Sequence, residues 1–294
     1  MTELPSWIIW SAMLRPWPYR FLIVSVFVVV VTLARPRSVA DGAATAFPAN
    51  RLGVALLGGQ ALALLATALF VAWTLGWTLS PRPELLEGWI DAPWRFYTEA
   101  LCYELGLLVS VYVLIKSGAA TWAFIGLRRP EVPFLLLIAA ITACYCGLHF
   151  VIKPLSISVD QWIVEASLHH PKVVGLGSDS SQFGLSILFE ALHDAGAWSA
   201  LLFVLIAGVL TPVIEELFFR GIVFKALLDS VPTWAALIGQ ALLFAAMHLE
   251  MGRLIYLFIF GLTLGFLVRW TSSLLPAVLL HVVVNVVALA AVIS

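Results

Sequence analysis

Side chains of the types that catalyse hydrolysis recur at helical spacing in the C-terminal third of the chain. Two adjacent carboxylates precede an arginine, one histidine follows a phenylalanine by four residues, and a second histidine precedes an asparagine by four. These side chains are Glu215, Glu216, Arg220, His248, His281 and Asn285. All of them interrupt apolar stretches. Because ionisable groups are expensive to place at bilayer depth, such a cluster predicts a functional site.

The two glutamates are expected to have different roles. Neighbouring residues on a helix point about 100° apart, so Glu215 and Glu216 cannot face the same point. Glu216 and Arg220 stand one turn apart, which is the spacing of an ion pair, and a buried arginine needs such a partner. Pro212 is expected to kink the helix and open space beside Glu215. We therefore interpret Glu216–Arg220 as a structural pair and Glu215 as the working acid or base.

His281 and Asn285 are also one turn apart and share a helix face. An asparagine amide and an imidazole can both donate hydrogen bonds, which is what an oxyanion hole requires. Straight spans would separate His248 from His281 by about 12 Å along the membrane normal, so their convergence requires a tilted or protruding helix. Taken singly, each histidine could pack against a carbonyl and Asn285 could join helices. Their joint occurrence favours a functional role.

The composition predicts an integral membrane protein. The chain has 294 residues, of which 62% are hydrophobic and 11% are charged. Soluble domains are about one quarter charged. The net charge of −1 provides no basic surface for nucleic acid. Cys102, Cys144 and Cys146 lie in apolar stretches and lack the spacing and partners of a zinc site, so no metal or cofactor is expected.

The hydrophobic pattern predicts an all-α, polytopic bundle of about eight membrane helices, with the active site between the last four. An N-terminal part, 1–152, contains about four spans, at 21–34, 52–79, 96–115 and 132–152. The segment 153–197 is polar and is expected to be an extramembrane loop. The catalytic core, 198–294, contains the remaining spans, at 198–223, 232–248, 254–268 and 274–293.

These motifs resemble the CAAX prenyl endopeptidase and bacteriocin-processing family of intramembrane glutamic proteases, also called CPBP or Abi. The family pattern is Glu-Glu-x-x-x-Arg, then Phe-x-x-x-His, then His-x-x-x-Asn. It is matched here in order by Glu215-Glu216 with Arg220, by Phe244 with His248, and by His281 with Asn285. The strong resemblance covers about 201–288, and the stretch 125–130 resembles a juxtamembrane segment of bacterial members.

The resemblance implies a glutamate-dependent endopeptidase that cleaves a membrane-associated peptide or protein. Glu215 and His248 would activate a water, His281 and Asn285 would stabilise the oxyanion, and Glu216 and Arg220 would support them. The expected location is the cell membrane of a prokaryote, as a multi-pass protein within the lipid bilayer.

Three other functions fit the same residues. One is a metal-dependent membrane protease, although no His-Glu-x-x-His motif is present. The second is a non-catalytic immunity or scaffold protein of the same family. The third is a transporter or proton relay, which the absence of a detectable internal repeat disfavours.

Overall fold

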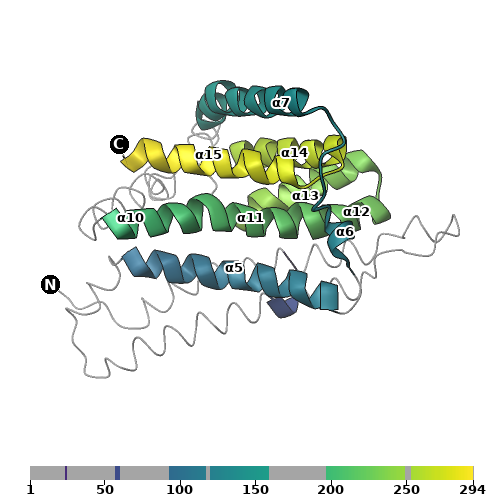
Figure 1. The fold of residues 1–294 in the computed structure, drawn as a ribbon, viewed down its shortest axis with the longest axis horizontal. Helices are drawn as coiled ribbons and strands as arrows, with labels where there is room; N and C mark the ends of the chain where they lie inside the picture. The colour runs from purple at the N-terminus through teal and green to yellow at the C-terminus, as the bar shows by residue number, and fades with distance from the viewer. Residues whose placement is uncertain are drawn as a thin grey trace, which may run out of the picture.

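The computed structural model describes residues 24, 57–59, 93–116, 120–158, 197–248 and 253–293. Every element within these ranges is helical, and no strand occurs in them. In Figure 1 the helices lie roughly side by side in layers. Helix α7 lies outermost, α14 and α15 come next, α10–α12 and α13 follow, and α5 covers the opposite side. The predicted all-α architecture is therefore confirmed for this part of the chain, while the total of eight spans stays a prediction.

Three of the described helices are long and apolar enough to cross a membrane by length and composition: Phe134–Ser158, Ala200–Ser230 and Leu254–Thr271. The apolar stretches Thr233–His248 and Leu275–Ala290 are shorter. Helix α5 (Pro93–Lys116) coincides with the predicted third span but is not among the three. It contains Glu104, which is only 2% exposed and therefore faces the bundle.

The predicted end of the fourth span differs from the structure. The fourth span was predicted to end at 152, but its helix, α7 (Phe134–Cys146) followed by η2 (Gly147–Ile152), continues to Ser158. The first residues of the predicted extramembrane loop are therefore helical. Of the first two predicted spans, only residues 24 and 57–59 are described, and 159–196 lie outside the described residues.

The helix that carries the two glutamates is continuous from α10 (Ala197–Phe203) to α12 (Phe224–Ser230). Two π-helical segments, η4 (Val204–Leu210) and η5 (Leu217–Val223), flank α11 (Thr211–Glu216). π-helical segments inside α-helices are frequently found at functional sites. The helix ends before Pro232, where Val231 is extended, as expected for a residue that precedes proline.

Helices α13 (Thr233–His248) and α14 (Leu254–Thr271) pack closely because α14 presents two glycines one turn apart. A Cβ at Gly261 would lie 3.1 Å from the Ala241 Cα, and one at Gly265 would lie 3.1 Å from a Leu237 methyl. The glycines thus let the two backbones approach closely, as small residues do where helices pack against each other in membranes. This contact fixes the face of α13 that carries Gln240 and Phe244.

The short helix α6 (Trp122–Ile125) and the residues after it are locked onto the connection between α14 and α15 (Leu275–Ile293). Ile125 is fully buried, and a Cβ at Gly221 would lie only 2.7 Å from it. The Gly126 carbonyl accepts from Leu274 N–H at 2.9 Å, and Glu131 N–H donates to the Thr271 carbonyl at 3.0 Å. The segment 125–130 therefore has a packing role that its resemblance to juxtamembrane stretches did not reveal.

Candidate functional site

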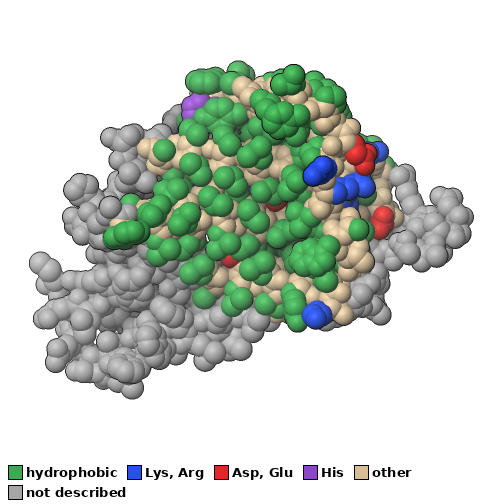
Figure 2. Space-filling model, viewed as in Figure 1, with side chains coloured by type: hydrophobic (Ala, Val, Ile, Leu, Met, Phe, Trp, Pro, Cys, Tyr) green, Lys and Arg blue, Asp and Glu red, His purple; other side chains and the backbone are tan. Residues whose placement is uncertain are grey.

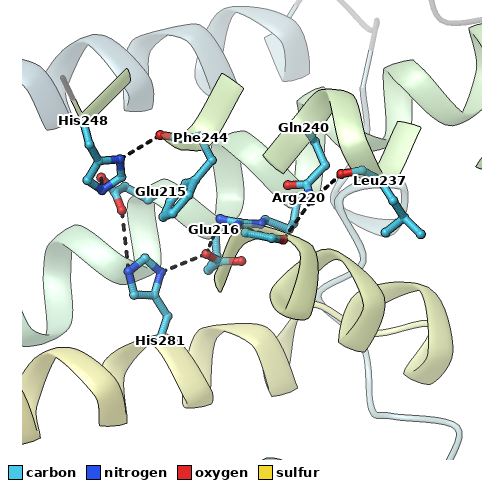
Figure 3. A network of polar contacts seen from close by, with 9 residues as sticks. Glu215, Glu216, Arg220, Leu237, Gln240, Phe244, His248 and His281 are labelled. Carbon is cyan, nitrogen blue, oxygen red and sulfur yellow. Dashed lines mark hydrogen bonds and ion pairs between the residues drawn. The ribbon is translucent and has the colours of Figure 1, made fainter. Parts of the chain in front are cut away.

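Glu215 and Glu216 are both buried in α11 but point toward different partners, as the helical geometry predicted. Glu215 is 4% exposed and Glu216 is fully buried. Figure 3 shows Glu215 between the rings of His248 and His281, whereas Glu216 lies between His281 and Arg220. The two carboxylates therefore belong to different interactions, and the ion pair with Arg220 is made by Glu216.

The predicted ion pair between Glu216 and Arg220 is present. Arg220 Nη1 lies 2.6 Å from Glu216 Oε1, and both side chains are inaccessible to solvent. Arg220 also approaches the Gly261 carbonyl, at 3.4 Å, and its guanidinium carbon lies 4.3 Å from the centre of the Phe244 ring. An aromatic face attracts a cation most strongly when water is excluded. The buried arginine is thus compensated by a carboxylate, a carbonyl and an aromatic ring.

His281 connects the two glutamates. Its Nδ1 lies 2.9 Å from Glu216 Oε1, and its Nε2 lies 3.7 Å from Glu215 Oε2. A carboxylate paired with arginine can only accept hydrogen bonds, so Nδ1 of His281 carries the proton that it donates. This hydrogen bond orients the ring and leaves Nε2 directed at Glu215. Glu216 therefore supports both Arg220 and His281.

His248 reaches Glu215 from the end of α13. Its Nδ1 lies 2.7 Å from the Phe244 carbonyl, and its Nε2 lies 3.9 Å from Glu215 Oε1. Because a carbonyl oxygen can only accept, Nδ1 of His248 also carries a proton. The side chain of His248 is 22% exposed, against 3% for that of His281. His248 therefore forms the more accessible side of the site.

The two histidines converge although straight spans would have placed them at different depths. At the right-hand end of the bundle in Figure 1, the turn between α12 and α13 extends beyond the first turn of α15. Helix α13 therefore starts before the level at which α15 begins, which brings its last residue to the level of His281. The convergence comes from this stagger, one of the two solutions that the sequence left open.

Aromatic rings enclose the polar groups. The Phe260 ring stands edge-on to His281 with 4.9 Å between centroids, and Phe244 lies 4.5 Å from His248. Phe219 packs edge-on against Phe244 at 5.2 Å. All three phenylalanines are at most 2% exposed. In a water-poor enclosure of this kind, electrostatic interactions between the polar groups are stronger than in solution.

Asn285 lies one turn from His281 and donates a hydrogen bond to the Ala207 carbonyl at 3.1 Å. Within η4 the Thr211 N–H donates to Ile206, five residues earlier. In that register the next donor would be residue 212, but proline has no N–H. Asn285 thus satisfies a carbonyl that Pro212 leaves without its helical donor, as neighbouring helices do in membranes. One amide hydrogen remains for other partners.

The structure also places polar groups in the site whose roles were not predicted. Gln240 is fully buried and donates to the carbonyls of Gly261, at 2.8 Å, and Leu237, at 3.1 Å. Gln240 and Arg220 therefore share the Gly261 carbonyl (Figure 3). A single amide in an otherwise apolar helix, opposite a Gly-x-x-x-Gly pair, was the available sequence signal. The hydroxyl of Thr211, one turn before Glu215, is buried without a hydrogen-bond partner.

The structure brings five of the predicted side chains together: Glu215, Glu216, Arg220, His248 and His281. The Asn285 side chain instead bonds to the Ala207 carbonyl of the neighbouring helix. Among the described residues, no group of three or more His, Cys, Asp or Glu side chains is arranged to hold a metal ion. Glu215 with two imidazole Nε2 atoms at 3.7–3.9 Å can accept and return protons. The separations exceed direct hydrogen-bond length and suit a bridging water.

Residues 197–287 match the family model described as type II CAAX prenyl endopeptidase Rce1-like. This match confirms the family resemblance and includes every motif residue named above. No curated protein matches the chain, and no solved structure does. The matched family is a protease family, which supports a CAAX-type membrane protease function.

Proposed function

We propose that the chain is an intramembrane endopeptidase in which Glu215 is the general base. The observation that carries the proposal is the convergence of two imidazole Nε2 atoms on a buried carboxylate that is separate from the Glu216–Arg220 pair. Burying a carboxylate inside a membrane bundle costs free energy of folding, so its presence there favours a functional role. The Rce1-like match independently supports peptidase chemistry.

The proposed reaction is hydrolysis of a peptide bond. A water held between Glu215 and His248 attacks the scissile carbonyl carbon and transfers one proton to the Glu215 carboxylate. The tetrahedral oxyanion is stabilised by His281 through its Nε2 and by the Asn285 amide. When the intermediate collapses, Glu215 returns the proton to the leaving nitrogen, so the products are a carboxylic acid and an amine.

Glu216 has a supporting role in this scheme. Its hydrogen bond to Nδ1 orients the His281 ring, and its ion pair holds Arg220 under the Phe244 ring. The more exposed His248 lies on the side from which a substrate segment would reach the site. We infer that the substrate is a segment of a membrane-associated protein and that the enzyme operates in the cell membrane of a prokaryote.

The first prediction concerns Glu215→Gln, which keeps the shape of the side chain and removes the base. Cells that carry this variant should lose peptide termini that cells with the wild-type protein produce, as measured by comparative membrane proteomics. Glu131→Gln is the matched control, because it makes the same chemical change at a side chain that is 62% exposed. The control should leave the cleavage pattern unchanged.

Retained cleavage by an abundant, folded Glu215→Gln variant would contradict the assignment of the base. If the wild-type protein and the variant are equally abundant and no terminus differs, the result would support a binding role, as in an immunity or scaffold protein. Once a cleaved peptide is known, chelator treatment and metal analysis of the purified enzyme distinguish the metal-free from the metal-dependent reaction.

A further inference from the structure

A cavity of about 270 Å³ lies where α12, α13 and the end of α14 meet, and it is lined by residues outside the site around Glu215. One part of its lining is polar and contains Lys225, Thr233, Arg269 and Ser272. The rest is apolar and includes Phe224 and Val268. A cavity lined by both cations and apolar side chains suits a ligand that is itself amphipathic.

Positive charge is concentrated at this cavity. Arg128 and Arg269 both lie close enough to Lys225 to repel it electrostatically, and Asp229 is the acidic group that attracts it. Arg128 Nε donates to the Ser272 carbonyl at 2.6 Å, which holds this guanidinium beside a lining residue. Figure 2 shows blue side chains, with red ones beside them, gathered at this end of a largely apolar surface. Two cations, Lys225 and Arg269, therefore line the cavity, and a third, Arg128, lies beside it in an exposed ion pair with Glu131.

Exposed tryptophans indicate the depth of the cavity in the membrane. Trp234 directly follows Thr233 and is 68% exposed, and Trp270 directly follows Arg269 and is 37% exposed. Trp122 of α6, whose following segment is hydrogen-bonded to the α14–α15 connection, is 57% exposed. Tryptophans gather at the level of the lipid headgroups, where the ring contacts both hydrocarbon and water. The cavity thus lies at the level of lipid phosphates.

We propose that this cavity binds the phosphate of an anionic phospholipid headgroup. The Arg269 guanidinium and the Lys225 ammonium would contact the phosphate oxygens, and the Thr233 hydroxyl would donate to one of them. The apolar side chains of the lining would contact the first carbons of the lipid acyl chains. A zwitterionic headgroup would be disfavoured, because its ammonium group would lie among the cations. This proposal does not depend on the proposed protease function.

The experiment is native mass spectrometry of the full chain in detergent, titrated with phosphatidylglycerol or phosphatidylcholine of identical acyl chains. The wild-type protein should retain phosphatidylglycerol in preference to phosphatidylcholine. The double variant Lys225→Gln/Arg269→Gln should bind phosphatidylglycerol roughly 10–30-fold more weakly, as expected for the loss of two cations near a lipid phosphate. Lys153→Gln/Arg253→Gln, which removes the same charge from two exposed positions outside the cavity, should bind like the wild-type protein.

A second arm uses inorganic phosphate alone, with thermal unfolding as the readout. If inorganic phosphate stabilises the wild-type protein but not the double variant, while phosphatidylglycerol shows no preference, the ligand is a soluble phosphate and the lipid proposal is overturned. Equal loss of phosphatidylglycerol in the two double variants would show that net charge rather than the cavity attracts lipid, and would also overturn it. Loss confined to Lys225→Gln/Arg269→Gln supports it.

Discussion

Charged side chains occur in two parts of the described bundle, around Glu215 in the interior and around Lys225 at one end. In the interior, Arg220 and Glu216 are fully buried and bonded to each other at 2.6 Å. At the end, Arg128 and Glu131 are 54% and 62% exposed and lie 3.4 Å apart, and cations line a cavity. The same residue types therefore meet opposite requirements. Buried charges must have fixed partners, whereas exposed charges need none because water and lipid headgroups screen them.

The contrast between the two regions helps to interpret the position of Glu215. Glu216 and Arg220 are paired with each other, and Glu216 also bonds His281, so the pair holds side chains in place within the bundle. Glu215 faces two imidazole nitrogens at 3.7 and 3.9 Å, which exceeds hydrogen-bond length. In the proposed function this carboxylate is the general base, which gives it a role different from that of Glu216. Three predictions test the contrast between the two regions, and they follow in order of the expected effect.

The largest effect is expected from Arg220→Ala. Removing one member of a fully buried pair should destabilise the fold by about 3–5 kcal/mol, because it leaves Glu216 uncompensated. The yield of monodisperse protein and its midpoint of thermal unfolding measure this loss. Arg129→Ala, at an exposed arginine, should leave both nearly unchanged.

A second variant separates the two tasks of Glu216. Replacing both partners, as in Glu216→Gln/Arg220→Met, should recover much of the lost stability, since neither position then carries an uncompensated charge. The same variant should remain inactive, because His281 loses the carboxylate at its Nδ1. If the Arg220→Ala protein were stable and fully active, the buried ion pair would contribute as little to stability as an exposed ion pair does.

Asn285→Ala is expected to have the next largest effect. If the amide contacts the oxyanion, cleavage should slow by roughly 10²–10³-fold. The substitution also removes the donor to the Ala207 carbonyl. Asn285→Ala/Pro212→Ala distinguishes the two roles, because an alanine at position 212 restores a backbone N–H near that carbonyl. Recovered stability with persistently slow cleavage supports a catalytic amide, whereas recovered cleavage would reassign Asn285 to helix packing.

The smallest effect is expected from Lys225→Gln/Arg269→Gln measured in detergent without added lipid. Lys225 is partly buried and Arg269 is exposed, and neither belongs to a fully buried ion pair, so the free energy of unfolding should change by about 0.5 kcal/mol or less. Thermal unfolding monitored by circular dichroism provides the measurement. A loss comparable to that of Arg220→Ala would mean that the basic end is held together by its charges, and would remove the contrast between the two regions.

The sequence was sufficient for the features that depend on local periodicity. The apolar runs predicted helices that the structure contains at 93–116, 197–230, 233–248, 254–271 and 275–293. Helical spacing correctly paired Glu216 with Arg220 and directed Glu215 elsewhere. These predictions hold because one turn of a helix brings the same residues together in any bundle.

Only the tertiary structure decided the rest, because it depends on how the helices are staggered and how closely they approach. The stagger of α13 against α15 brings His248 and His281 to one carboxylate, which sequence distance could not establish. The close contact at Gly261 places its carbonyl between Arg220 and Gln240. The π register before Pro212 selects the Ala207 carbonyl as the partner of Asn285. Each depends on contacts between residues far apart in the chain, which no local pattern encodes.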